Sequence, residues 1–150
     1  MDRHIASVVR QVVDEYLSRL EAEQHKTKLV IVLEYESVEQ DGVLKAVQSL
    51  TAAYEAAVFA SEAWHTQAVN QLKPISVFQL RGNRKALIEA LQSAEALVVP
   101  SISYSYIAKL SMTMDDDPPL YASIAMQLQG KPVMICDDNL AFDVREASMV

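Results

Sequence analysis

The sequence predicts an α/β domain built on a doubly wound parallel sheet, and two observations lead to this prediction. Short apolar runs of strand length alternate along the chain with longer segments in which apolar residues recur every three or four positions. The first apolar run, residues 29–33, is continuous, as expected for a parallel strand that is buried on both faces. Strands that alternate with helices imply right-handed crossovers between parallel neighbours.

The first element is an amphipathic helix within residues 1–24. Its apolar stripe consists of Ile5, Val8, Val9, Val12, Val13, Tyr16, Leu17 and Leu20. The opposite face is expected to hold Arg3, Arg10, Gln11, Asp14, Glu15 and Arg19. A polar stretch, residues 21–28, follows it. The predicted organisation is therefore a helical appendage, residues 1–24, joined to a domain of residues 28–150.

About five strands are predicted in that domain, which makes it Rossmann-like. They are residues 29–33, 56–60, 75–80, 96–99 and 133–136. The fourth strand is stopped by Pro100.

Helix signals lie between these strands. Ser37-Val38-Glu39-Gln40 has the pattern of a capping box, and the helix after it carries Val43, Leu44, Val47 and Leu50. The turn at residues 81–83 leads into a helix whose inward side is predicted to be Ala86, Leu87, Ala90 and Leu91. Another helix is expected to start near Ser103. A last one has Asp117 as N-cap, prolines in its first turn and Gly130 at its end.

Composition excludes several classes of partner. The chain has 150 residues and a formal net charge of −7, which disfavours binding to nucleic acid or to an anionic membrane surface. No apolar run approaches the roughly 20 residues that cross a bilayer. The single cysteine, Cys136, excludes an intramolecular disulfide framework. We therefore expect a cytoplasmic protein.

A ligand of such a sheet binds beyond the carboxyl ends of the strands, which selects residues 34–37, 61–64, 100–105 and 136–139. The third segment is the most unusual, because Ser101, Ser103 and Ser105 alternate with tyrosines between a strand and a helix start. Hydroxyls and backbone N–H groups there bind an anion without Lys or Arg. Tyr104, Tyr106 and Trp64 offer flat surfaces for an aromatic ring. The alternative, left open by the pattern, is that the serines cap a helix and the tyrosines pack.

The segment Pro100-Ser101-Ile102-Ser103-Tyr104-Ser105-Tyr106-Ile107-Ala108-Lys109-Leu110 resembles the P-x-(S/T)-x-N-(S/T)-(I/L)-A-K motif of the FMN-binding flavoprotein family. That family includes phosphopantothenoylcysteine decarboxylases, peptidyl-cysteine decarboxylases, flavin prenyltransferases and the dipicolinate synthase B subunit. The likeness covers about residues 28–140. It continues through the acidic residues and prolines at 115–119 and through residues 130–135.

The resemblance implies FMN as the cofactor and a set of residues that bind it. Ser103 and Ser105 would hold its phosphate or ribityl hydroxyls, and Ser61 would lie near the isoalloxazine edge. The remaining members of the expected set are Ser37, Ser101, Tyr104 and Asn139. The chain departs from the family where Glu34-Tyr35-Glu36-Ser37 replaces a Gly-Ser turn and where Tyr104 replaces the motif asparagine. A carboxylate beside a phosphate is unfavourable unless it points away.

The family's decarboxylases carry a histidine in the helix before the fourth strand, where this chain reads Lys85-Ala86-Leu87. The expected role is therefore redox chemistry or flavin handling rather than decarboxylation. The resemblance also implies a homo-oligomer, with a neighbouring subunit completing the flavin site. Two alternatives stay open: a flavin-free binding or assembly subunit that keeps the fold, and a dipicolinate synthase B-like subunit that needs a partner chain.

The first helix resembles the encapsulation peptides that dock enzymes inside bacterial microcompartments. That resemblance implies contact with shell or cargo proteins through residues 1–20 and a place in the microcompartment lumen. The alternative is a helix packed on its own domain or on a neighbouring subunit.

The other candidates have plainer interpretations. His65 is expected at the surface, and Cys136 in a structural role. The carboxylates of residues 115–117 are expected to form a solvated helix cap rather than a cation site.

Overall fold

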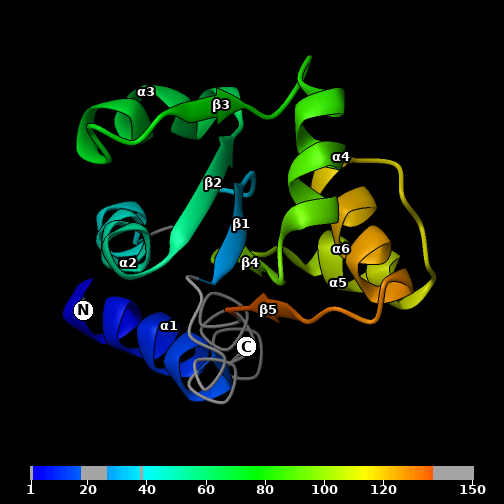
Figure 1. Cartoon of the computed structure of the whole chain (residues 1–150), viewed down its shortest axis with the longest axis horizontal. Coiled ribbons are helices and arrows are strands. Elements are labelled where there is room, and N and C mark those ends of the chain that lie inside the picture. Colours follow the sequence, from blue (N-terminus) through cyan, green and yellow to red (C-terminus); the bar gives the residue numbers. More distant parts are fainter. Residues whose placement is uncertain (1, 18–26, 38, 137–150) are drawn as a thin grey trace, which may run out of the picture.

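The computed structural model describes residues 2–17, 27–37 and 39–136, and it has the predicted fold class. Five parallel strands form one sheet with helices on both faces (Figure 1). The strands are β1 (Lys28–Leu33), β2 (Glu55–Ala60), β3 (Val77–Gln79), β4 (Ala96–Val99) and β5 (Val133–Ile135). Their order is β3-β2-β1-β4-β5, so the direction of winding reverses between β1 and β4. This Rossmann-like arrangement has its topological switch point at those two strands.

The central strand explains the continuous apolar run in the sequence. β1 pairs with β2 from Lys28 opposite Glu55 to Leu33 opposite Ala60, and on its other side it pairs with β4. Leu29, Ile31 and Leu33 pack into one hydrophobic layer, and Val30 and Val32 pack into the other. Because both faces are covered, no position between Leu29 and Leu33 is exposed.

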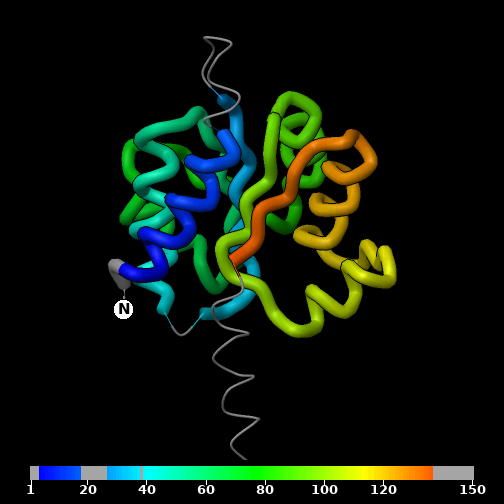
Figure 2. The backbone as a smooth tube through the Cα atoms, turned by 90° about the horizontal axis from the view of Figure 1, so that it is seen from below, coloured from blue at the N-terminus to red at the C-terminus, as the bar shows by residue number. Residues whose placement is uncertain are grey.

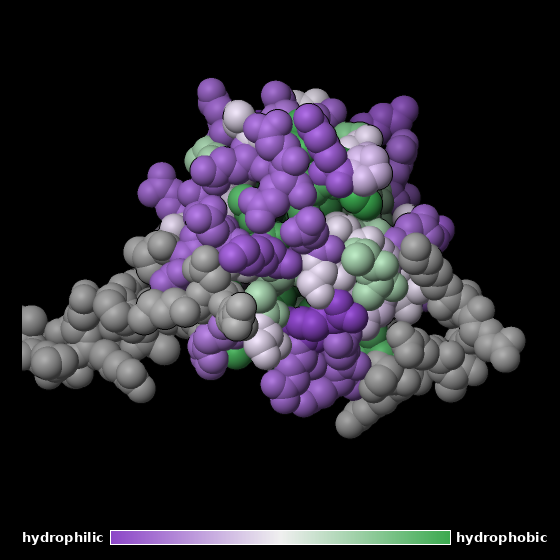
Figure 3. Space-filling model, turned by 90° about the vertical axis from the view of Figure 1, so that its left-hand side faces the viewer, coloured by the Kyte–Doolittle hydropathy of each residue, from purple (hydrophilic) through white to green (hydrophobic). Residues whose placement is uncertain are grey.

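Three of the described helices cover each face of the sheet, an arrangement that can be followed in Figures 1 and 2. One layer contains α1 (Asp2–Leu17), α2 (Gln40–Ala53) and α3 (Glu62–Gln71). The other contains α4 (Arg84–Ser93), α5 (Tyr104–Ser111) and α6 (Pro118–Leu128). The outer surface of the first layer is largely hydrophilic (Figure 3). None of the described helices combines the length and the apolarity needed to cross a bilayer.

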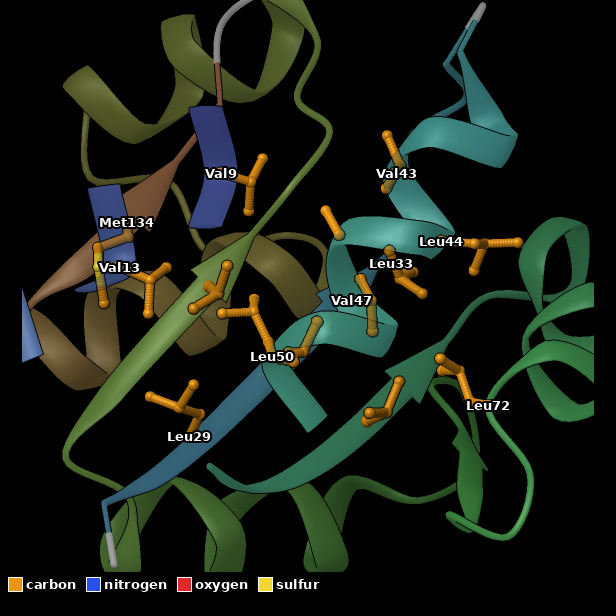
Figure 4. Packing of buried hydrophobic residues seen from close by; sticks show 14 of the residues in the cluster. Val9, Val13, Leu29, Leu33, Val43, Leu44, Val47, Leu50, Leu72 and Met134 are labelled. Atoms are coloured by element: carbon orange, nitrogen blue, oxygen red, sulfur yellow. The ribbon is translucent and has the colours of Figure 1, made fainter. Parts of the chain in front are cut away.

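Helix α1 packs on its own domain, which was one of the arrangements left open by the sequence. Ile5, Val9, Val13 and Leu17 belong to the same buried cluster as β1 and α2. In Figure 4, Val9 and Val13 point into this cluster, and Val13 lies beside Met134 of β5. Val12 and Tyr16, the outer edge of the predicted stripe, are 46% and 42% exposed. Leu20 lies outside the described residues.

The polar side of α1 differs from the prediction. Arg10 and Asp14 were expected on the face opposite the apolar stripe, but both contact residues of the helix α2 region. The Arg10 guanidinium pairs with Asp14 at 2.8 Å and donates to the Ser49 backbone carbonyl at 2.9 Å, while the Tyr54 hydroxyl donates to Asp14 at 2.6 Å. Arg10 and Asp14 flank the buried stripe and form a polar contact between α1 and α2.

The start of α2 also corrects a prediction. Ser37 does not cap this helix, because the N-cap position belongs to Glu39, which makes no side-chain cap bond. The Ser37 hydroxyl instead accepts the Glu39 backbone N–H at 3.1 Å, so the chain makes a local turn before the helix begins.

Helix α3 was not predicted. Only Trp64 and Ala68 of its ten residues are buried, so its apolar periodicity is too weak to read from the sequence. The start of α6 is confirmed, since Asp117 accepts the Leu120 N–H at 3.0 Å and Pro118 occupies the first turn. Gly130, with φ of +70°, follows directly after the helix end, as predicted.

Candidate functional site

The loops after β1 and β4 meet at the switch point and contact each other directly. The Ser101 hydroxyl donates to the Glu36 backbone carbonyl at 3.4 Å. The Tyr35 ring lies against the Tyr106 ring with a centroid distance of 5.5 Å. These contacts join the segments that follow the two central strands, β1 and β4, at the carboxyl edge of the sheet.

Ser61 and Ser101, two of the predicted flavin contacts, are buried beneath the loop that follows β1. Ser61 is 7% exposed and Ser101 is 2% exposed. The Ser61 hydroxyl donates to the Glu34 carbonyl at 3.3 Å, just as Ser101 donates to Glu36. Both hydroxyls position the backbone of the loop that follows β1, residues 34–37, which we call the β1 loop.

The rest of the serine segment lies at the surface. Ser103 is the N-cap of α5, and its oxygen accepts the Tyr106 N–H at 3.1 Å, which leaves its hydroxyl proton for another acceptor. Tyr104 is 50% exposed, and Ser105 is exposed as well. Ser37 is half-buried. Asn139 lies outside the described residues.

Two of the three aromatic residues predicted to face a ligand do not do so. Trp64 is 0% exposed and Tyr106 is 1% exposed, and each has a partner for its polar group. The Trp64 indole N–H donates to the Tyr35 carbonyl at 3.2 Å. The Tyr106 hydroxyl lies 2.7 Å from the Ser123 hydroxyl. Both rings are core residues, and Tyr104 is the accessible member of the three.

A cavity of about 480 Å³ opens beside this region, between the end of β3, α4 and the start of α6. One wall carries Arg81 and Arg84, from the turn after β3 and the first residue of α4. The other wall carries residues 115–117 and Tyr121, from the loop before α6 and its first turns. The full lining is Leu80, Arg81, Gly82, Arg84, Leu87, Asp115, Asp116, Asp117, Pro118 and Tyr121.

The β1 loop holds both walls. Glu34 accepts a hydrogen bond from Arg81 at 2.8 Å, and the Tyr35 hydroxyl donates to the Asp117 carboxylate at 3.0 Å. Within the described chain, the second Glu34 carboxylate oxygen is buried without a hydrogen-bond partner. Neighbouring residues of one loop therefore set the separation of the two walls.

The charged side chains of the two walls have different partners. The Arg84 guanidinium lies over the Tyr121 ring, 4.8 Å from its centroid. Asp116 pairs with Lys109 at 2.9 Å, a hydrogen bond that raises the pKa of the Lys109 amine. Burial and then the Asp117 carboxylate raise the pKa of the Tyr35 hydroxyl far above its ordinary value, so Tyr35 acts as a hydrogen-bond donor and not as a base.

Two isolated candidates have structural roles. A ring nitrogen of His65, Nε2, lies 3.3 Å from the Val77 carbonyl, which links α3 to β3. Cys136 is half-buried and packs against the cluster that contains α1.

The described residues include no group of three or more His, Cys, Asp and Glu side chains placed to hold a metal ion. Asp117 is the helix cap that the sequence predicted.

Sequence reasoning did not single out Arg81, Arg84 or Tyr121. A signal was present, because the turn at residues 81–83 follows a predicted strand and so lies at the same sheet edge as the serine segment. Tyr121 is three residues into a helix and carries no such signal. Comparison with protein-family models, with curated proteins and with solved structures finds no match for this chain.

Proposed function

We propose that the chain is a flavoprotein that binds FMN at the carboxyl edge of its sheet, with the FMN phosphate at the first turn of α5. The observation that carries this proposal is the position of Ser103 and Ser105. Both are accessible at the start of an eight-residue helix that follows β4 at the switch point. Backbone N–H groups and hydroxyls at such a helix start bind phosphate without basic side chains.

The residues around this position fit FMN in part. Ser103 and Ser105 would donate to phosphate oxygens, and Tyr104, which is half-exposed, would offer its ring to the flavin. Ser61 and Ser101 fit less well, because their protons serve the β1 loop. The two carboxylates of that loop oppose an anion only weakly, since Glu34 is paired with Arg81 and Glu36 is exposed to water.

Bound FMN supplies reversible electron and hydride transfer. The protein's part in this proposal is to bind the phosphate, orient the ring and limit the access of water. A redox or flavin-handling role is favoured over cysteine decarboxylation, because α4 begins with Arg84 and Lys85 and has no histidine.

The test is the visible spectrum of the purified protein and a fluorescence titration with FMN. Ser105→Asp places a carboxylate where the phosphate would lie, while an acidic residue in the first helical turn does not disfavour the helix. We expect this variant to fold normally and to lose FMN affinity by at least about tenfold, the loss of one charge-assisted contact.

Ser76→Asp is the matched control, because Ser76 is exposed and precedes β3 at the opposite edge of the sheet. FMN affinity should be unchanged in this variant. A protein that is colourless as purified and does not quench added FMN would contradict the proposal.

A second candidate is a flavin-free binding or assembly subunit that keeps the fold. The contacts between the β1 and β4 loops favour it, since Ser101, Glu36 and the Tyr35 and Tyr106 rings occupy the centre of the switch point. The absence of FMN binding together with a stable fold would support this candidate. Co-purification with an enzyme chain encoded nearby would favour a dipicolinate synthase B-like subunit.

The homo-oligomer and the microcompartment location also belong to this proposal. Light scattering after size-exclusion chromatography measures the first. For the second, residues 1–20 fused to a reporter should co-purify with shell proteins. In the intact chain the apolar stripe of α1 is buried, so shell docking in this way requires α1 to leave α2.

A further inference from the structure

The cavity between α4 and α6 has the size of a small-molecule site and a polar lining. Its volume of about 480 Å³ lies within the usual range for such sites. Three of its ten lining residues, Leu80, Leu87 and Pro118, are apolar. A ligand that fills it must therefore bring polar groups to meet the arginines of one wall and the carboxylates of the other.

The arginine wall is suited to an oxyanion. Arg84 is held by its stacking on Tyr121, and no described carboxylate lies within ion-pair distance of it. Arg81 gives one N–H to Glu34, and 65% of its side chain is exposed. A guanidinium presents several donors in one plane, so these two side chains have donors left for a phosphate or carboxylate group.

The aspartate wall is suited to hydrogen-bond donors. Asp115 is exposed, and Asp116 is half-exposed in its pair with Lys109. Ionised carboxylates only accept hydrogen bonds, so they select hydroxyl or amino groups and repel a second anion. Asp117 is already occupied by Tyr35 and by the Leu120 N–H, and it acts as a support of this wall.

We propose that this cavity binds a small hydroxylated organic anion, with the oxyanion on Arg81 and Arg84 and the hydroxyl groups on Asp115 and Asp116. The separation of opposite charges across the cavity distinguishes this class of ligand from others. An apolar ligand leaves both walls unpaired, and a polyanion meets the aspartates. The site does not depend on the binding of FMN at α5, because its residues and those of the serine segment are different.

The probes are D-ribose 5-phosphate, gluconate, inorganic phosphate and ribose. Titration of isotopically labelled protein, followed by amide and arginine Nε–H NMR signals, reports both affinity and location. We expect ribose 5-phosphate or gluconate to shift the signals of Gly82, Arg84 and Asp116. The probe with the higher affinity identifies the preferred oxyanion as phosphate or carboxylate. Ribose should bind more weakly than either.

Arg84→Gln should weaken the tighter probe by at least about tenfold, as expected for the loss of a charge-assisted hydrogen bond. Lys85→Gln is the matched control, because Lys85 is the next residue of α4, is exposed and does not line the cavity. The control removes the same charge and should change the affinity by less than about twofold. Circular dichroism checks that both variants fold.

Asp115→Asn separates the roles of the two walls. It removes a negative charge, so inorganic phosphate should bind as well as before or more tightly. The preference for ribose 5-phosphate or gluconate over inorganic phosphate should fall. Equal weakening by Arg84→Gln and Lys85→Gln, or probe-induced shifts outside the cavity, or no shifts at all, would overturn the proposal. Ser105→Asp should leave these titrations unchanged, so a failure here is distinct from a failure of FMN binding.

Discussion

Tyr35→Phe tests how the β1 loop supports the α6 wall of the cavity. The Tyr35 hydroxyl lies 3.0 Å and 3.2 Å from the two Asp117 carboxylate oxygens, and its ring lies 5.5 Å from the Tyr106 ring. Phenylalanine keeps the ring contact and removes only the hydrogen bond. The substitution therefore isolates the link between the end of β1 and the start of α6.

The expected loss follows from the type of bond. A hydrogen bond to a charged acceptor contributes about 1.5–3 kcal/mol, and the partial exposure of both partners places this one near the lower end. We expect the free energy of unfolding at neutral pH to fall by about 1.5 kcal/mol. In a domain of this size, that is a fall in Tm of about 3–6 °C.

The pH dependence provides a second signature. Burial and Asp117 raise the pKa of Tyr35 above its ordinary value of 10.0, so the folded protein keeps a proton that the unfolded chain loses. The stability contributed by this group is complete below pH 10 and decreases above it, by about 1.4 kcal/mol per pH unit. Tyr35→Phe lacks this decrease. The stability difference between the two proteins should shrink above pH 10, reach zero at about pH 11 and change sign above that pH.

Urea unfolding followed by circular dichroism, at neutral pH and at several alkaline pH values, measures both effects. Tyr16→Phe is the control, because Tyr16 is 42% exposed and its hydroxyl has no hydrogen-bond partner among the described residues. If Tyr35→Phe cost no more than Tyr16→Phe at neutral pH, the bond to Asp117 would not support the wall. A stability difference that stayed constant above pH 10 would contradict the retained proton.

Two further predictions concern the core. Val13→Ala should lower the free energy of unfolding by about 2 kcal/mol, because Val13 is 1% exposed, whereas Val12→Ala at a 46% exposed position should cost less than about 0.5 kcal/mol. Equal effects in thermal melts would mean that α1 is an appendage and not part of the core. Ser123→Ala should cost more than Tyr106→Phe, with the larger loss about 1–3 kcal/mol, because Ser123 donates to the Pro119 carbonyl and accepts from Tyr106. Chemical denaturation of both variants gives the order, and the reverse order would show that the hydroxyl of Tyr106 is not a donor.

Much of the fold could be predicted because its signals are local. The run at residues 29–33 required a strand buried on both faces, and Asp117 followed by two prolines required a helix start. Helix α3 escaped prediction because Trp64 and Ala68 are its buried residues and give little periodicity. The capping box at Ser37 failed because Ser37 bonds the N–H two residues ahead, where a turn competes with the helix.

The candidate site was predictable only in position. The rule that ligands bind beyond the carboxyl ends of parallel strands selected this edge of the sheet, and the serine segment on it, as the expected place of a site. It did not separate Ser105, which is accessible, from Ser101, which is buried against Glu36. Nor could it show that Tyr106 faces the core while Tyr104 faces water.

The amino-acid sequence by itself determined the five strands, every described helix except α3, and the approximate ends of these elements, and it selected the carboxyl edge of the sheet for the expected ligand site. These depend on hydrophobic periodicity and on caps a few residues long. Only the tertiary structure decided that the apolar stripe of α1 packs in one cluster with α2. It also decided that Arg84 lies over Tyr121 beside the carboxylates of residues 115–117. That cavity exists because a turn after β3 and a loop before α6, far apart in the chain, are both fastened to the residues that follow β1.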